Sequence, residues 1–218
     1  MATECAGQVQ ACAIRVVRLA ADGSPIQGPD NMVVSDALVS LTATPVYTDG
    51  DEVELKNACG SVVVSAIGDD SFKRIDVTLE IARPDPHLAE LLSTGDVLSP
   101  PSGAPKGFAF PAIGPITDYG VSIELWAKRI VEGTQDSAYP WWRWLFPRVK
   151  NLRLGERRIE NGVLVSTYSG RAFGNPEWLD GPEGDWPYPT VPSDRPAQYI
   201  PAATIPTVTC GYLTTSGS

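Results

Sequence analysis

The chain reads Ile75-Asp76-Val77-Thr78-Leu79-Glu80-Ile81 over residues 75–81, an alternation of apolar and polar side chains without a break. Successive side chains of a β-strand point to opposite faces of its sheet, so this period of two predicts a strand. We expect its four apolar side chains to lie on a buried face and the polar ones to face water or a partner.

The next segment, residues 85–95, carries the clearest helix signature in the sequence. Asp85 can accept hydrogen bonds from the free N–H groups of a first turn, and Pro86 fits the first helical position. Leu88, Leu91 and Leu92 make one apolar stripe, and Gly95 suits the position after the C-cap. We expect this helix to pack on an edge or an open end of the sheet, with His87 exposed on its first turn.

Strand patterns dominate the rest of the chain. Apolar and polar residues alternate over 39–44, 52–56 and 121–128, and further strands are expected over about 11–20, 61–67, 158–173 and 203–213. Asp49-Gly50 lies between two of these runs and predicts a hairpin turn, because glycine accepts the positive φ of tight turns. Seven to nine strands predict a mainly β fold, a β-sandwich or barrel with one flanking α-helix.

Two stretches rich in proline and glycine predict long loops. Residues 99–117 contain five prolines and are expected to form an extended loop. Residues 175–206 contain eight prolines, which exclude a helix or a central strand through most of this Pro-rich C-terminal segment. A break near 99–117 would allow two domains, but we expect a single β domain over residues 1–218.

The formal charge of −9 argues against ordinary nucleic-acid binding, which needs Lys and Arg against phosphate. The charge is uneven, because residues 1–100 carry an acidic excess and residues 101–158 a basic one. A solvated surface would explain this pattern, and so would head-to-tail stacking of identical subunits. No targeting signal or apolar run of membrane-spanning length is apparent, so a cytosolic site of synthesis is expected.

The sequence predicts no enzyme, cofactor or metal site. His87 is the only histidine, and the chain has no nucleophile elbow, P-loop or dinucleotide motif. Four cysteines, Cys5, Cys12, Cys59 and Cys210, lack zinc-ligand spacing, and we expect buried free thiols, with disulfides after release from the cell as the alternative. The acids of residues 49–54 lack the calcium-loop pattern and are expected to be solvated.

Residues 139–147, Tyr-Pro-Trp-Trp-Arg-Trp-Leu-Phe-Pro, are the most unusual segment. Exposed Trp beside paired carboxylates would suggest sugar binding through ring stacking, but the flanking charges are basic. Trp and Arg are favoured anchors of interfaces, so burial in a core or a subunit interface is the preferred interpretation.

The order of these features resembles the major tail tube proteins of siphophages, especially those of actinobacterial hosts. The resemblance rests on TDGDEVELKNACG (48–60), RIDVTLEIARPDPHLAELLSTG (74–95), YGVSIELWAKRI (119–130) and FGNPEWLDGPEGDWP (173–187). It implies a structural virion protein, not an enzyme, whose β-sandwich or barrel assembles into stacked hexameric rings. The tryptophan-rich segment and the proline-rich segment depart from the family pattern.

The resemblance also implies partners and a location. The partners would be further copies of the chain, other phage tail proteins, and genomic DNA that passes through the tube without specific binding. No membrane is involved, and the protein would reside in the virion tail after assembly in the host cytoplasm. The alternatives are a carbohydrate-binding β-sandwich module, a tail terminator and a head decoration protein.

Opposite charges suggest where copies would meet. We hypothesise that an acidic hairpin of one subunit approaches a basic stretch of a neighbour. The alternative is that both regions are only solvated. The acidic set is Asp49, Asp51, Glu52 and Glu54, and the basic set is Arg148, Lys150, Arg153, Arg157 and Arg158.

Overall fold

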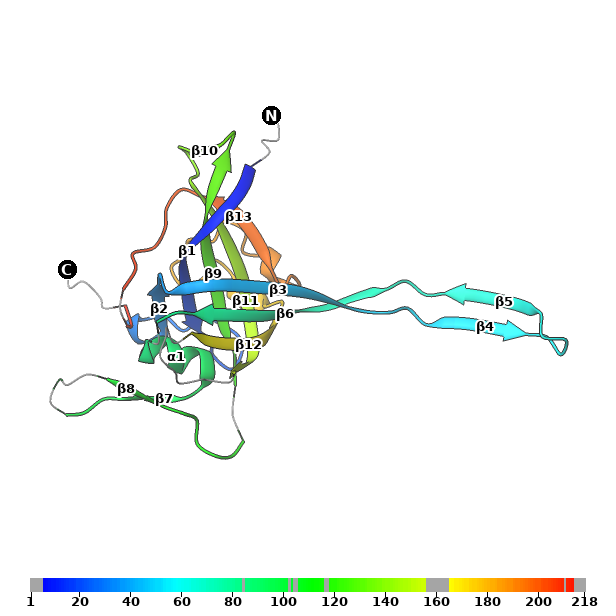
Figure 1. The fold of residues 1–218 in the computed structure, drawn as a ribbon, viewed down its shortest axis with the longest axis horizontal. Helices are drawn as coiled ribbons and strands as arrows, with labels where there is room; N and C mark the ends of the chain where they lie inside the picture. The colour runs from blue at the N-terminus through cyan, green and yellow to red at the C-terminus, as the bar shows by residue number, and fades with distance from the viewer. Residues whose placement is uncertain are drawn as a thin grey trace.

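The computed structural model describes residues 6–83, 85–101, 103, 106–115, 118–155, 165–209 and 211–213. These residues form a body built on one large antiparallel β-sheet, with one α-helix and a long two-stranded arm (Figure 1). The predicted mainly β fold with a flanking helix is therefore confirmed for the described part of the chain.

The strands are β1 (Ala6–Arg18), β2 (Met32–Ser35), β3 (Leu38–Thr48), β4 (Glu52–Lys56), β5 (Val62–Ile67), β6 (Ser71–Ile81), β7 (Asp96–Leu98), β8 (Gly107–Ala109), β9 (Val121–Val131), β10 (Thr134–Gln135), β11 (Trp141–Leu154), β12 (Ser166–Phe173) and β13 (Gln198–Ala202). The α-helix is α1 (Pro86–Ser93), and three short 3-10 helices are η1 (Pro29–Asn31), η2 (Pro176–Trp178) and η3 (Val191–Ser193).

The large sheet has the strand order β2-β1-β9-β11-β12-β6-β3, with β10 added to β9 and β13 to β11. In Figure 1, β3, β6 and β12 cross in front of β1, β9 and β11, so the sheet folds over on itself. The main apolar core fills the space between the two halves, because Ile14, Ile123 and Phe146 from one half share a cluster with Leu79 and Tyr168 from the other. The result is a sandwich-like arrangement.

The strand predicted over 75–81 is the inner half of β6. Val77, Leu79 and Ile81 are buried in the main core and Ile75 packs against it. The apolar stripe of α1 joins the same cluster, as the sequence indicated. Local alternation therefore identified both the strand and its buried face.

The N-terminal end of α1 matches the prediction and two other details do not. Asp85 accepts a hydrogen bond from the N–H of His87, and Pro86 occupies the first turn. His87 is only 9% exposed, so its predicted exposure is wrong. The left-handed residue after the helix is Thr94 instead of Gly95. Gly95 is required for another reason, because a Cβ there would lie 2.4 Å from the carbonyl oxygen of Ala109.

The predicted hairpin turn at Asp49-Gly50 is also wrong. The chain runs straight through these residues from β3 into β4, and it returns through β5 into β6. Gly50 faces Gly68 on the returning strand, so closely that a Cβ at Gly50 would lie 1.9 Å from the Gly68 carbonyl oxygen. The pair lies between the ends of β3 and β6 and the strands β4 and β5, which form the outer part of the long ribbon at the right of Figure 1.

The real turn lies at the far end of the arm, at residues 57–60. The Asn57 side chain accepts hydrogen bonds from the N–H groups of Cys59 and Ser61, and the Gly60 N–H bonds to the Asn57 carbonyl. Gly60 has φ +83°, a conformation that glycine adopts without steric cost. Cys59 is exposed at this tip, which contradicts the expectation of a buried thiol, whereas Cys12 is half-buried; Cys5 and Cys210 lie outside the described residues.

Other boundaries differ from prediction in informative ways. The strand expected over 203–213 is absent from its described residues, which contain only an isolated bridge between Tyr212 and Val33. A short strand, β13, lies instead inside the proline-rich segment, at the edge of β11. The loop expected over 99–117 contains β8, which pairs with β7 in a small two-stranded flap. Of the strand expected over 158–173, residues 166–173 are confirmed and 158–164 lie outside the described residues.

Candidate functional site: an acidic arm, a basic face and a buried charge cluster

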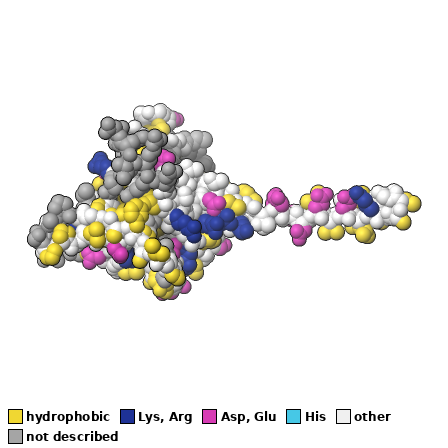
Figure 2. Space-filling view, turned by 60° about the horizontal axis from the view of Figure 1, so that its bottom comes forward, with side chains coloured by type: hydrophobic (Ala, Val, Ile, Leu, Met, Phe, Trp, Pro, Cys, Tyr) yellow, Lys and Arg dark blue, Asp and Glu magenta, His cyan; other side chains and the backbone are white. Residues whose placement is uncertain are grey.

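The arm, residues 49–70, is an amphipathic ribbon. Its cross-strand pairs Val53–Ala66 and Leu55–Val64 lie on one face, and Glu52 and Glu54 lie on the other. Every residue of β4 and β5 is exposed, with Val53 at 57% and Leu55 at 59%. Figure 2 shows most of the hydrophobic side chains along one side of the arm and most of the acidic ones along the other, although Ile67 lies opposite Glu52 on the acidic face. The arm therefore presents an apolar face that its own body does not cover.

The arm is strongly acidic. It carries Asp49, Asp51, Glu52, Glu54, Asp69 and Asp70 against a single base, Lys56. Lys56 lies 3.3 Å from a Glu54 carboxylate oxygen, and both side chains are well exposed. Exposed pairs of this kind contribute about 0–1 kcal/mol, so most of the negative charge is available to a partner.

A basic face lies on the outer side of β11, β12 and β6. It is defined by Lys150, Arg153, Arg171 and Arg74, and register places Lys150 directly opposite Arg171 and Arg153 opposite Ser169. Like charges directly opposite each other in a sheet are destabilising. Among the described residues, neither Lys150 nor Arg153 has an ion-pair partner. Figure 2 shows Lys and Arg side chains gathered where the arm leaves the body.

The basic face contains a shallow groove of about 380 Å³. Arg153 and Arg171 line it, together with Asp76, Thr78 and Asn151. The Asp76 carboxylate accepts a 2.7 Å hydrogen bond from Arg74, and this bond lowers the pKa of Asp76 below its ordinary value. Asp76 is the one acid among the residues that line the groove, and it is paired with Arg74. The groove therefore keeps an excess of positive charge from Arg153 and Arg171.

The structure brings together only part of the predicted basic set. Lys150 and Arg153 lie on the basic face, but Arg148 points elsewhere and donates a hydrogen bond to the Tyr119 carbonyl. Arg157 and Arg158 lie outside the described residues. Sequence reasoning missed Arg171, because only the pairing of β11 with β12 places it beside Lys150. The four predicted acids all lie on the arm.

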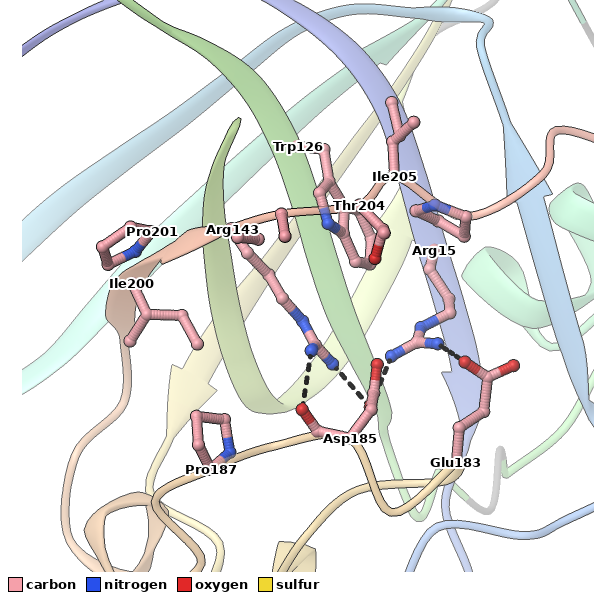
Figure 3. A pocket seen from close by; sticks show the side chains of 13 residues that line it. Arg15, Trp126, Arg143, Glu183, Asp185, Pro187, Ile200, Pro201, Thr204 and Ile205 are labelled. Atoms are coloured by element: carbon pink, nitrogen blue, oxygen red, sulfur yellow. Dashed lines mark hydrogen bonds and ion pairs between the residues drawn. The ribbon is translucent and has the colours of Figure 1, made fainter. Parts of the chain in front are cut away.

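A second arrangement, the charge cluster, is buried on the outer face of β1, β9 and β11 and consists of Arg15, Glu124, Arg143, Glu183 and Asp185. Figure 3 shows all of these except Glu124. Glu124 is fully buried and accepts from Arg15 Nε at 2.5 Å and from Arg143 Nε at 2.7 Å. Asp185 accepts from Arg143 Nη2 at 2.9 Å, and Glu183 accepts from Arg15 Nη1 at 2.5 Å. One central carboxylate thus links β1, β9 and β11.

Two tryptophans cover the arginines of this cluster. The guanidinium carbons of Arg15 and Arg143 each lie 5.3 Å from the Trp126 ring centroid, and that of Arg143 lies 5.2 Å from Trp186. Trp186 belongs to the proline-rich segment, and it packs with Trp178 in a second apolar cluster. The proline-rich segment therefore acts as a strap that covers the outer face of β1, β9 and β11.

The charge cluster also has electrostatic consequences. Burial alone would raise the pKa of Asp185, but the hydrogen bond and charge of Arg143, with the charge of Arg15, outweigh burial and lower it. A cavity of about 290 Å³ separates the cluster from residues 200–206. Because its guanidinium groups are already bonded to carboxylates, the cluster is suited to fixing the strap on the sheet.

The tryptophan-rich segment forms the first half of β11. Arg143, Leu145 and Phe146 are buried, whereas Trp142 and Trp144 gather around Tyr199 of β13. Trp144 stacks on Tyr199 with ring centroids 4.5 Å apart, and Tyr199 remains 56% exposed. The segment is thus part core strand and part surface aromatic cluster.

Two further features bear on function. Among the described residues, no group of three or more His, Cys, Asp or Glu side chains could hold a metal ion. No helix in the same residues has the length and apolar content to cross a membrane. The sequence matches no known protein family and no curated protein.

Proposed function

We propose that this protein is a structural subunit that assembles with copies of itself into the tail tube of a long-tailed phage. The observation that carries the proposal is the arm, which extends well beyond the body and leaves its apolar face exposed (Figure 1). The resemblance in sequence order to tail tube proteins supplies the kind of assembly, stacked rings that are expected to be hexameric.

The arm favours assembly for a physical reason. An isolated two-stranded hairpin is at best marginally stable in water, and exposed edges and apolar ribbons invite pairing with another chain. Val53, Leu55 and Val64 have no cover within the body, so cover from a neighbouring copy would stabilise the arm.

Charge supports a contact between the arm of one copy and the basic face of another. The arm carries six acids and one base, and the basic face has cations without partners among the described residues. Each exposed ion pair would contribute about 0–1 kcal/mol, so the charges would set register and encounter rate. Apolar contacts would supply most of the affinity.

The assembly of a tube would also give the net charge a role and define the partners of the protein. The formal charge of −9 would limit sticking of genomic DNA during its passage through the lumen, because acidic walls repel phosphate. The partners would be further copies of the chain and other tail proteins, in the virion.

Electron microscopy of the purified full-length protein, with light scattering, tests the assembly directly. We expect rings or tubes from the wild type, and monomers from a variant in which a two-residue turn replaces residues 51–67. Since Gly50 and Gly68 already face each other, this replacement leaves the body intact. A wild type that stays monomeric at every concentration and salt tested, or tubes from the armless variant, would contradict the proposal.

Charge reversal tests the contact separately. The double variant Arg153→Glu/Arg171→Glu should slow tube growth, and added salt should slow it for the wild type. Its matched control is Arg83→Glu/Arg195→Glu, which changes the net charge equally at two well-exposed sites. Equal growth of tubes by both double variants would contradict a role of the basic face in the interface. It would not contradict the assembly of a tube.

One observation keeps carbohydrate binding as the second candidate. Trp142, Trp144 and Tyr199 form a partly exposed aromatic cluster, and sugar rings stack on such surfaces. A monodisperse protein whose tryptophan fluorescence titrates with an oligosaccharide, and does not titrate in Tyr199→Ala, would favour this function over the tube.

A further inference from the structure

Thr209, Tyr212 and Leu213 are held at the β2 edge of the large sheet. The N–H of Thr209 donates to the carbonyl of Val34 at 3.1 Å, and the N–H of Leu213 donates to that of Met32 at 3.2 Å. Between them, Tyr212 forms an antiparallel bridge with Val33. Thr209 and residues 211–213, here called the tail, therefore pair with β2 as a further strand would.

Helix α1 supplies the second wall of this binding slot. The Gly211 N–H donates to a carboxylate oxygen of Asp85 at 2.7 Å, and the Tyr212 hydroxyl donates to Glu90 at 2.7 Å. The His87 ring lies against the Tyr212 ring with centroids 4.2 Å apart. Asp85 thus caps the helix and holds the tail at once.

The slot is fitted to glycine followed by tyrosine. Gly211 has φ +90°, and a Cβ there would lie 3.1 Å from His87 Cδ2. Tyr212 packs against the main core, and burial together with the bond to Glu90 raises its pKa. Backbone bonds to β2 hold the tail as a strand, while these two side-chain positions select its sequence.

The connection to the tail is weakly held. Figure 1 shows it as an orange-red line that runs from the end of β13 to the β2 end of the sheet. None of the backbone hydrogen bonds of the described residues involves 203–208, which include Pro206. Fully extended, residues 203–213 span roughly 35 Å. The expected radius of gyration of a domain of this size is about 17 Å, so a released tail reaches past its own body.

We propose that the slot between β2 and α1 is a strand-exchange site, which takes the tail of a second copy in place of its own. The tail of a neighbouring copy would make the same contacts with the slot as the chain's own tail. Exchange therefore alters only which copy supplies the tail and leaves the contacts themselves unchanged. Crowded copies favour it, because an assembly raises the local concentration of neighbouring tails. The inference goes beyond the tube function and applies to any assembly of this chain.

A labelled peptide with the sequence of residues 203–213 tests the slot by fluorescence anisotropy. The acceptors are the full-length wild type and full-length Tyr212→Ala, whose own tail competes less. We expect saturable binding that is at least several-fold tighter to Tyr212→Ala than to the wild type. A peptide that carries Tyr212→Ala itself should bind both acceptors at least tenfold more weakly. As a matched control, the acceptor Tyr139→Ala, which loses an exposed tyrosine, should behave as the wild type.

Native mass spectrometry then tests exchange between copies. Full-length protein is mixed with a chain that ends at residue 202, and we expect a heterodimer that Tyr212→Ala in the full-length donor abolishes. If the shortened chain does not fold, full-length Tyr212→Ala replaces it as the acceptor. Equal binding of the two peptides, or peptide binding without any heterodimer, overturns the exchange.

Discussion

Replacing Glu124 by Gln removes the carboxylate that the two buried arginines of the charge cluster share. Glu124 is fully buried and bonds to Arg15 Nε at 2.5 Å and to Arg143 Nε at 2.7 Å. Gln keeps the volume and one acceptor oxygen, but its NH₂ group replaces the other oxygen, so one guanidinium group loses its acceptor and the negative charge between the two cations is gone. Breaking a buried ion pair from one side costs about 3–5 kcal/mol.

The matched control for this change is Glu183→Gln, in the same cluster. Glu183 bonds to Arg15 at 2.5 Å, but its side chain is 48% exposed, so water replaces much of the lost interaction. We expect a cost of about 0–1 kcal/mol for this variant. The structure therefore predicts a large difference between two Glu→Gln changes that meet the same arginine.

Urea unfolding followed by tryptophan fluorescence measures both costs, at concentrations too low for assembly. With a slope of about 2–3 kcal/mol/M, the Glu124→Gln midpoint should fall by about 1–2 M, and the slope should not change. Trp126 and Trp186 lie over the arginines, so their emission reports on the same region. Equal costs for the two variants, or less than about 1 kcal/mol for Glu124→Gln, would refute the interpretation of the cluster as the fixing point of the strap.

Three further predictions concern the core, the root of the arm and pH. Leu79→Ala should cost about 2–5 kcal/mol in urea unfolding, and Val39→Ala, at a 53% exposed position, less than about 1 kcal/mol; equal costs would contradict the assigned core face. Gly50→Ala should reduce tube yield in electron microscopy by displacing the returning strand, whereas Gly7→Ala, with its nearest neighbour 4.0 Å away, should not. Burial, and then the charge of Lys106, lower the pKa of His87 below its ordinary 6.5, so the unfolded chain takes up the proton first. Its stability contribution should be complete above pH 6.5 and should fall as pH drops toward the lowered pKa; an unchanged stability difference between wild type and His87→Gln from pH 7.5 to 5.5 would refute this.

Short sequence patterns correctly predicted those strands and helices whose conformation depends on neighbouring residues in the chain. The strict alternation of residues 75–81 identified the buried face of β6, and Asp85 with Pro86 marked the start of α1. The Asp49-Gly50 pair wrongly predicted a hairpin turn, because glycine is equally suited to a tight turn and to a close crossing of two strands. Only Gly68, on the returning strand, decides between them.

Features that depend on distant partners were not predictable from spacing. Alternation predicted a strand over 121–128, but it did not indicate that Glu124 is buried under the strap and meets Arg15 from β1. Arg171 joins the basic face only through the register of β12 with β11. The burial of His87 likewise depends on Tyr212, more than 100 residues further along the chain.

The facing glycines at the root of the arm have a mechanical consequence. At Gly50 and Gly68 no side chains interlock across the two strands, so this is the point where the arm turns most easily relative to the body. The seven residues from 51 to 57 span about 23 Å at a rise of about 3.3 Å per residue. A rotation of about 10° at the glycines therefore moves the tip by roughly 4 Å, comparable to the spacing of two strands in a sheet. The arm can therefore swing as a lever about these two glycines, which lie just beyond the outer ends of β3 and β6.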